Sequence, residues 1–363
     1  LAGLYERARD YEQLASTLEK LAEVTFDDKQ KVEVLTKLGQ VAGDRLKDDE
    51  RAAEAYRLLL TLRPDDRRAQ EQLKKRYVAL GRWDDLELFY ADTGNWDEFI
   101  RVLESNESRA ESDAQRIGML MKVAELWVTQ KGKPDRAARA LEKVLSIDET
   151  HLDAAERLIP IYEQANNPKG LAKAIEAKLT HMDEPEVRLE LLRQVAQLYE
   201  ERLRDKESAF ERFASAFALA PADEQSQGDM ERAAKATGAW DRVVAAYQTA
   251  IEGADEDTAG VLRLRLGRIF VDELGKVEEA LAEYRAVYES QPDNSEALVA
   301  LETLYRKTGG WADLLEVYNK KLELAADPED RKTTLFAIAE LQEQQLGDAT
   351  SAIQTYDAVL EED

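Results

Sequence analysis

Residues Gly309 to Tyr318 read GGWADLLEVY, and this stretch determines the fold class because its outline recurs along the chain. Two glycines, which stop helices, precede Trp311, and apolar side chains follow the tryptophan by three and seven residues. Residues with that spacing lie on one face of an α-helix. Similar segments begin at Trp96 (NWDEFIRVL) and Trp240 (AWDRVVAAY). We therefore predict that these tryptophans are packing anchors between helices and do not bind a ligand.

The apolar stripe that begins in this way occurs five times. Its first position is usually aromatic, and Pro168 is the exception. The first positions are Tyr11, Trp96, Pro168, Trp240 and Trp311; Leu14, Phe99, Leu171, Val243 and Leu314 follow by three; Leu18, Leu103, Ile175, Tyr247 and Tyr318 follow by seven.

A second marker shows that these stripes belong to a longer repeat. It is an alanine with an aromatic residue or leucine four positions after it. A glycine or alanine lies thirteen positions before it. Small residues let two helices approach closely, and the larger side chain fills the space beyond them. The alanines are Ala52, Ala137, Ala209, Ala280 and Ala352; the larger residues are Tyr56, Leu141, Phe213, Tyr284 and Tyr356; the small residues are Gly39, Ala124, Ala196, Gly267 and Ala339.

The intervals between the alanines are 85, 72, 71 and 72 residues, so the repeating unit has about 72 residues. In the fourth copy the apolar pattern predicts four helices, over residues 257–275, 276–291, 295–309 and 311–325. Glycine or proline ends the first three, and Ser295 is a candidate N-cap. The short connections predict that consecutive helices pack antiparallel, and each pair needs a neighbour to bury its apolar face.

One interval is irregular. The first exceeds the others by 13 residues, and Trp83 and Trp96 are also 13 residues apart. We therefore predict that the helix beginning at Trp83 is an extra one. An odd number of helices disturbs antiparallel stacking, so we expect a kink or a change of twist near residues 82–106.

The order of these residues resembles the tetratricopeptide repeat, a helix–turn–helix of 34 residues. The resemblance extends along nearly the whole chain and implies an all-α fold, a right-handed α-solenoid of stacked antiparallel helix pairs. Every second hairpin departs from the pattern, since it lacks the central alanine and the final proline, and HEAT-type or other α-solenoids remain alternatives. The best matches are Gly267, Phe270, Ala280, Tyr284 and Pro292 in one copy, and Ala196, Tyr199, Ala209, Phe213 and Pro221 in another.

We expect a single repeat array over residues 1–363 that is cut within a repeat at both ends. Its parts are residues 1–26 (partial), 27–106, 107–183, 184–254, 255–327 and 328–363 (partial). Cut ends expose apolar faces that normally lie under the next repeat, so end-to-end self-association is an expectation as well.

The composition argues against most kinds of chemistry. There is no cysteine, and His151 and His181 are the only histidines, so we expect no thiolate site, catalytic triad, metal or cofactor. The formal net charge of −25 disfavours nucleic acid and anionic membranes, and no run of eighteen apolar residues predicts a membrane span. Carboxylates are abundant, and we interpret those in LRPDDRR, GADEDT and LEED as solvated. The compartment stays open, with the cytoplasm as default and a bacterial periplasm or cell envelope as alternatives.

Two basic clusters stand out against this acidic background. Each is either part of a charge-balanced helix exterior or a docking site for an acidic peptide tail or a carboxylate. One consists of Arg67, Arg68, Lys74, Lys75 and Arg76, and the other of Arg263, Arg265 and Arg268.

The resemblance also implies where a partner would bind. In tetratricopeptide arrays the first helix of each hairpin lines a concave groove, and the residue after the small position, with the one three residues further on, would face it. The resulting row is polar and mixed in charge, without the clustered Lys and Arg of a dedicated carboxylate clamp. It comprises Gln40, Glu125, Gln197, Arg268 and Glu340, then Gly43, Val128, Glu200, Val271 and Glu343; our candidate contacts are Gln40, Glu125, Gln197, Glu200, Arg268, Val271 and Glu340.

The sequence therefore predicts a non-catalytic scaffold that binds a peptide or helix of a partner protein in this groove. The alternative is a regulatory, sensory or assembly module of a larger protein whose catalytic or envelope-anchoring part lies outside this chain. A solenoid enzyme is the least favoured interpretation, since no constellation of catalytic residues was found.

Overall fold

The computed structural model describes residues 1–361, which form 21 α-helices and no β-strand. The all-α prediction is confirmed. None of the described helices is long and apolar enough to cross a membrane. Glu362 and Asp363, at the end of the LEED stretch, lie outside the described residues.

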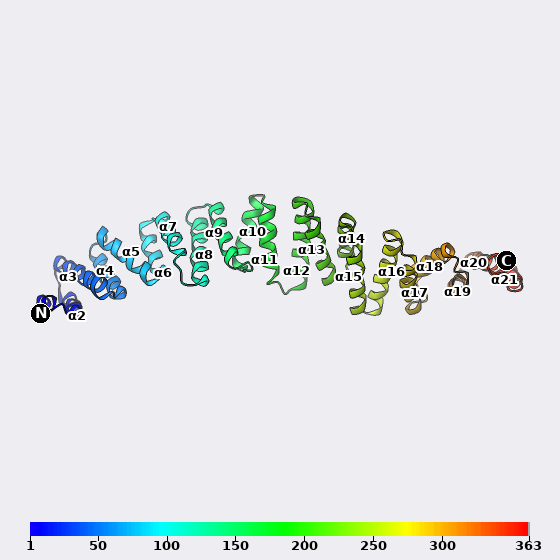
Figure 1. Ribbon diagram of the computed structural model, residues 1–363, viewed down its shortest axis with the longest axis horizontal. Coiled ribbons are helices and arrows are strands. Elements are labelled where there is room, and N and C mark those ends of the chain that lie inside the picture. The colour runs from blue at the N-terminus through cyan, green and yellow to red at the C-terminus, as the bar shows by residue number, and fades with distance from the viewer. Residues whose placement is uncertain (362–363) are drawn as a thin grey trace. The chain divides into compact units, whose positions relative to one another are not determined.

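The chain divides into two compact units, Leu1–Glu149 and Thr150–Asp363. In each, consecutive helices pack side by side in chain order, which is the predicted α-solenoid arrangement (Figure 1). The first unit contains α1 (Ala2–Ala8), α2 (Tyr11–Val24), α3 (Asp28–Gln40), α4 (Asp49–Leu62), α5 (Arg67–Leu80), α6 (Trp83–Thr93), α7 (Trp96–Glu107), α8 (Asp113–Thr129) and α9 (Pro134–Ile147), with a π-helical turn, η1 (Val41–Leu46), after α3.

The second unit continues the same pattern. It contains α10 (Leu152–Gln164), α11 (Pro168–Leu179), α12 (Pro185–Gln197), the π-helical turn η2 (Leu198–Leu203), α13 (Lys206–Leu219), α14 (Glu224–Thr237), α15 (Trp240–Gly253), α16 (Glu256–Asp272), α17 (Val277–Ser290), α18 (Ser295–Thr308), α19 (Trp311–Leu324), α20 (Pro328–Gln344) and α21 (Ala349–Glu361).

The fourth copy contains the four helices that the sequence predicts, α16 to α19. We number the helices of each repeat 1 to 4 in this order. One detail of the prediction is wrong: the N-cap of α18 is Asn294, whose side-chain oxygen accepts a hydrogen bond from the backbone N–H of Ala297 at 3.1 Å. Ser295 is the first helical residue. Asparagine and serine are comparably good N-caps, so the residue types alone could not show which of these two neighbours caps the helix.

Helices 1 and 2 of a repeat approach closely where the small residue lies. A Cβ atom added to Gly39 would lie 2.6 Å from Cζ of Tyr56, and one added to Gly267 would lie 2.6 Å from Cζ of Tyr284. The tyrosine ring therefore occupies the space that a side chain on helix 1 would need. In the second repeat Ala124 and Leu141 take these positions, and both are buried.

The turn that follows helix 1 has the same hydrogen bond in all five copies. The residue eight positions after the small residue is left-handed, and the next N–H bonds to the carbonyl six residues before it. Three copies place glycine there, but Lys47 (φ 59°) and Arg204 (φ 57°) hold it in the other two. These are the two copies in which helix 1 ends in a π-helical turn.

The extra helix of the first interval is α6. Its 11 residues, with the connection Gly94–Asn95 that separates it from α7, account for the 13 additional positions. The change of twist near residues 82–106 stays a prediction.

The fourth helix of each repeat contributes its apolar stripe to the core. All ten residues three and seven positions after the start of the stripe are buried, from Leu14 and Leu18 to Leu314 and Tyr318. Trp240 and Trp311 are partly buried and pack against the core of the second unit. The tryptophans thus begin the buried face of their helices.

Candidate functional site

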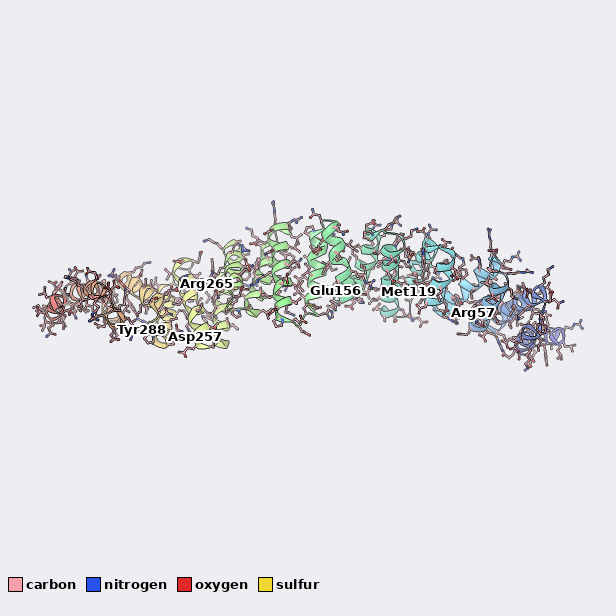
Figure 2. The ribbon with its side chains drawn as sticks, turned by 180° about the vertical axis from the view of Figure 1, so that it is seen from behind. Arg57, Met119, Glu156, Asp257, Arg265 and Tyr288 are labelled. Carbon is pink, nitrogen blue, oxygen red and sulfur yellow. The ribbon has the colours of Figure 1, made fainter. Side chains whose placement is uncertain are left out.

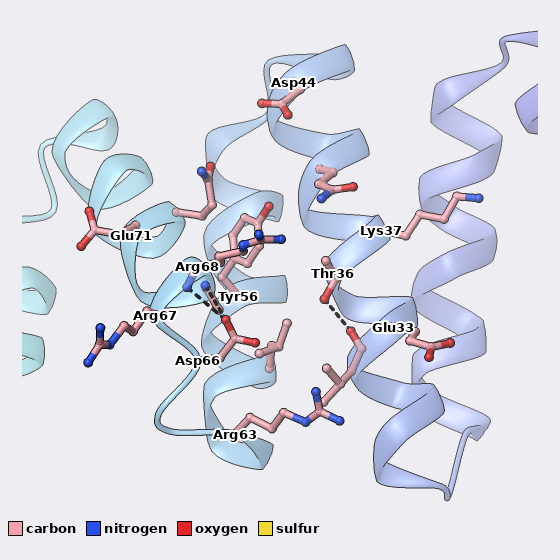
Figure 3. A pocket seen from close by; sticks show the side chains of 15 residues that line it. Glu33, Thr36, Lys37, Asp44, Tyr56, Arg63, Asp66, Arg67, Arg68 and Glu71 are labelled. Atoms are coloured by element: carbon pink, nitrogen blue, oxygen red, sulfur yellow. Dashed lines mark hydrogen bonds between the residues drawn. The ribbon is translucent and has the colours of Figure 1, made fainter.

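A cavity of the first unit lies between α3, the end of α4 and the start of α5, and has a volume of about 800 Å³ (Figure 3). Val32, Thr36 and Gln40 line it from α3. Arg63 lines it from the connection between α4 and α5, and Arg67 and Arg68 line it from the start of α5.

The backbone of this connection positions the arginines. Helix α4 ends at Leu62, and Pro64 prevents its continuation. Asp66 then caps α5, because its Oδ1 accepts hydrogen bonds from the N–H groups of Arg68 and Ala69, both at 3.1 Å. Arg67 and Arg68 are therefore the first two residues of α5 and begin beside the cavity (Figure 3).

The cavity is lined by four cations, Lys37, Arg63, Arg67 and Arg68, and by four carboxylates, Glu33, Asp44, Asp66 and Glu71. Within residues 1–361 the guanidinium groups of Arg63, Arg67 and Arg68 form no ion pair, and all three residues are exposed. Three of the carboxylates have other partners: Asp66 caps α5, Asp44 bonds to Arg76 at 2.9 Å, and Glu71 bonds to Lys74 at 2.5 Å. Glu33 is exposed and forms no ion pair among the described residues. The three arginines therefore lack an internal carboxylate partner.

The first predicted basic cluster is divided by the structure. Arg76 is only 5% exposed and donates to Asp49 at 2.8 Å and to Asp44 at 2.9 Å. Its guanidinium fills the space beside Gly43, where an added Cβ would lie 2.6 Å away. Arg76 therefore links α5 to the first repeat hairpin and is not available to a partner.

Lys74 is also engaged, between Glu71 at 2.5 Å and Glu98 at 2.7 Å. Burial lowers the pKa of Lys74, but the hydrogen bonds to the two carboxylates outweigh it and raise the pKa above the ordinary value. Of this cluster, Arg67 and Arg68 remain at the cavity, and Lys75 is exposed.

The second predicted cluster is neutralised. Arg263 bonds to Glu283 at 2.7 Å, Arg265 bonds to Glu231 at 2.7 and 3.0 Å, and Arg268 bonds to Glu296. Arg265 lies on α16 (Figure 2). Of the two interpretations of this cluster, the structure therefore agrees with the charge-balanced helix exterior.

Residues of the predicted partner-binding row lie on five separate segments, α3, α8, α12 with η2, α16 and α20. In the first unit, Gln40 is exposed and lines the large cavity, whereas Glu125 is half-buried and bonds to Lys122 at 3.4 Å. Gln40 is the candidate contact that the structure brings together with the free arginines.

In the second unit, two row residues are already paired. Glu200 accepts two hydrogen bonds from Arg232, at 2.8 and 3.3 Å, and Arg268 bonds to Glu296. Both ion pairs join helix 1 of a repeat to helix 3. Gln197 and Glu340 are exposed and Val271 is half-buried. A partner would have to compete with the ion pairs, and the role of these five residues stays a prediction.

Sequence reasoning missed Arg63. It stands alone before Pro64 and is not part of a cluster in the sequence. The sequence did contain a signal that Arg63 lies near Arg67 and Arg68. Only Pro64–Asp66 separate it from the start of the next helix, so the end of α4 and the start of α5 must lie side by side. Within residues 1–361 no group of three or more His, Cys, Asp or Glu residues could hold a metal ion.

Comparison with known proteins places the chain among helical repeat proteins. The family model described as tetratricopeptide repeat matches residues 297–332, which include α19 and most of α18. The repeat spacing, the stacked helix pairs and this match make the chain a tetratricopeptide-like helical repeat protein. No curated protein matches the sequence.

Solved structures with similar arrangements include "Structure of Naa15/Naa10 bound to HypK-THB", with 15% identity and a TM-score of 0.29. That match covers 98% of this chain, which spans 61% of the other chain's length. Another is "Crystal structure of APC/C hetero-tetramer Cut9-Hcn1", with 13% identity, a TM-score of 0.26, and coverage of 99% of this chain and 85% of that one.

Proposed function

We propose that this protein is a non-catalytic interaction scaffold that binds an acidic segment of a partner protein in the cavity between α3 and α5. A tetratricopeptide-like repeat suggests a role in protein–protein interaction, and the cavity supports a more specific assignment. The observation that carries it is the set of three arginines, Arg63, Arg67 and Arg68, that line about 800 Å³ without an internal ion pair.

The chemistry of the occupant follows from these side chains. A guanidinium group binds a carboxylate through two parallel hydrogen bonds, which are stronger than bonds between neutral groups. The rest of the chain is strongly acidic and would repel such a segment elsewhere. The cavity wall also includes the buried apolar residues Val32 and Leu59.

A site-specific crosslinking experiment tests the proposal. The photoreactive residue p-benzoylphenylalanine would replace Gln72, which lines the cavity, or Gln164, an exposed residue of α10 that serves as control. Irradiation in an extract of the source cells should crosslink a discrete protein at position 72 and not at position 164.

Charge reversal should abolish that crosslink. We expect it to disappear in the Arg67→Glu/Arg68→Glu variant and to persist in Lys206→Glu/Lys307→Glu, which makes the same change of net charge at exposed residues elsewhere. A crosslink that survives Arg67→Glu/Arg68→Glu, or that forms equally at position 164, would show that this cavity is not the binding site.

A further inference from the structure

An ion pair recurs where one repeat meets the next. Glu19 on α2 accepts a hydrogen bond from Arg51 on α4 at 2.6 Å, and Glu176 on α11 accepts one from Arg212 on α13 at 2.7 Å. Each glutamate lies eight residues after the start of a helix at position 4. Each arginine lies on helix 2 of the following repeat, next to or three residues after the repeat alanine. We call this arrangement the repeat joint.

The joint formed by α7, α8 and α9 has the residue types of the first joint. Glu104 corresponds to Glu19, and Arg136 corresponds to Arg51. Ala140 stands where the other joint has Arg212, and Arg139 immediately precedes it. Nevertheless, in the part of the chain that the structure describes, Glu104, Arg136 and Arg139 form no ion pair. Glu104 and the two arginines line the same cavity, but Glu104 neutralises neither of them through an ion pair.

Local competition explains the difference. The Arg136 guanidinium lies over the Trp127 ring, 4.8 Å from its centroid, where the first repeat has Ala42 and offers no such surface. Asp97 corresponds to Glu12, which bonds to Arg51 at 2.8 Å, but Lys131 holds Asp97 at 2.7 Å. A cation over an aromatic face is stabilised. Arg136 is therefore held beside Trp127 while its usual partner bonds elsewhere.

The result is a basic cavity of about 400 Å³. Four cations line it, Arg101 from α7 and Arg136, Arg139 and Lys143 from α9, against two carboxylates of α7, Asp97 and Glu104. Lys143 is the one cation of these four that is paired, with Glu107 at 2.8 Å. The corresponding cavity of the first joint is lined instead by Glu19, Glu23, Glu50 and Glu54.

We propose that the cavity between α7, α8 and α9 is a second binding site, which takes carboxylate side chains of an acidic protein segment. The bound carboxylates accept hydrogen bonds from Arg136 and Arg139, which Glu104 leaves unpaired. The cavity wall also includes the apolar side chains of Trp127 and Ile100, of which Trp127 is the more exposed. The site shares no helix with the cavity between α3 and α5 and does not depend on the function proposed for that cavity.

The test uses the full chain, fluorescein-labelled hexaglutamate as the probe, and fluorescence anisotropy at low ionic strength. All variants carry Arg67→Glu/Arg68→Glu, so that the cavity between α3 and α5 does not contribute. We expect saturable binding in this background, and a loss of affinity of at least about tenfold when Arg136→Glu/Arg139→Glu is added, because both donors are removed.

The matched control adds Lys206→Glu/Lys307→Glu to the same background, which changes the net charge equally, and should keep most of the affinity. These side chains are all exposed, and circular dichroism verifies that each variant is folded. The absence of saturable binding in the background protein, an equal loss in the control, or displacement of hexaglutamate by inorganic phosphate at equal concentration would overturn the assignment. None of these outcomes bears on the crosslink at position 72.

Discussion

The first and second repeats of the first unit share a backbone but differ in the side chains that stabilise it. The first pairs Gly39 with Tyr56, and the second pairs Ala124 with Leu141. In both, the larger residue lies 17 positions after the small one. A larger residue on helix 2 accompanies a smaller one on helix 1. The difference teaches that these two repeats fill the space between the two helices with different residues, the added volume on one helix being offset by a loss on the other.

The two repeats also end helix 1 differently. A left-handed residue follows it in both, but it is Lys47 in the first repeat and Gly132 in the second. Only glycine adopts that conformation without a steric cost. The first repeat therefore contains backbone strain that the second avoids.

The largest expected effect comes from placing the small residue of the second repeat, alanine, into the first repeat without also changing the tyrosine that it faces. Gly39→Ala should lower the free energy of unfolding by about 1–3 kcal/mol, because the new Cβ would meet the Tyr56 ring at 2.6 Å. Adding Tyr56→Leu should restore much of the loss. Urea unfolding followed by circular dichroism measures both.

Gly118→Ala is the matched control for Gly39→Ala. Gly118 lies within α8, and a Cβ added there would have no atom within 4 Å. This change should stabilise the protein by about 0.5–1 kcal/mol, since alanine favours a helix more than glycine does. If Gly39→Ala were as stable as Gly118→Ala, the close approach of helices 1 and 2 would not be a constraint.

The next effect concerns the left-handed residue. Lys47→Gly should raise the free energy of unfolding by about 1 kcal/mol, because it removes a Cβ from a backbone with φ of 59°. Gly132→Ala, at the equivalent position with the same φ, should lower it by about as much. Thermal unfolding gives both values. Shifts of the same sign in the two variants would contradict this account of the helix end.

The smallest effect separates the two joints. Glu19→Gln should cost about 0.2–1 kcal/mol, the range of a partly exposed ion pair, because Arg51 loses a partner. The hydrogen bond to Glu19, with that to Glu12, raises the pKa of the Arg51 guanidinium above its ordinary value. Glu104→Gln should leave stability unchanged, since Glu104 has no cationic partner among the described residues.

Salt gives an independent measure of the same difference. The cost of Glu19→Gln should shrink at high ionic strength, where exposed charges are screened. Equal costs for Glu19→Gln and Glu104→Gln at low salt would mean that the joint of α7, α8 and α9 contains an ion pair in solution, and the second binding site would lose its basis.

The sequence by itself determined the helices, their grouping into repeats of about 72 residues, and the existence of an extra helix beginning at Trp83. These features follow from spacing along one helix and from residues that stop helices, which act over a few positions. The same local logic relates Gly39 to Tyr56 and places Leu314 and Tyr318 on one face. Where two neighbours were equally suited, as with Asn294 and Ser295, the local pattern did not decide.

Only the tertiary structure decided which charges are free. Arg265 and Arg67 are both clustered arginines in the sequence, yet one is bound to Glu231 and the other lines a cavity unpaired. Ion pairs such as Arg51–Glu19 join residues about 32 positions apart, and a single neighbour such as Trp127 redirects them. Because such pairing depends on distances of a few ångströms between different helices, spacing along the chain does not contain it.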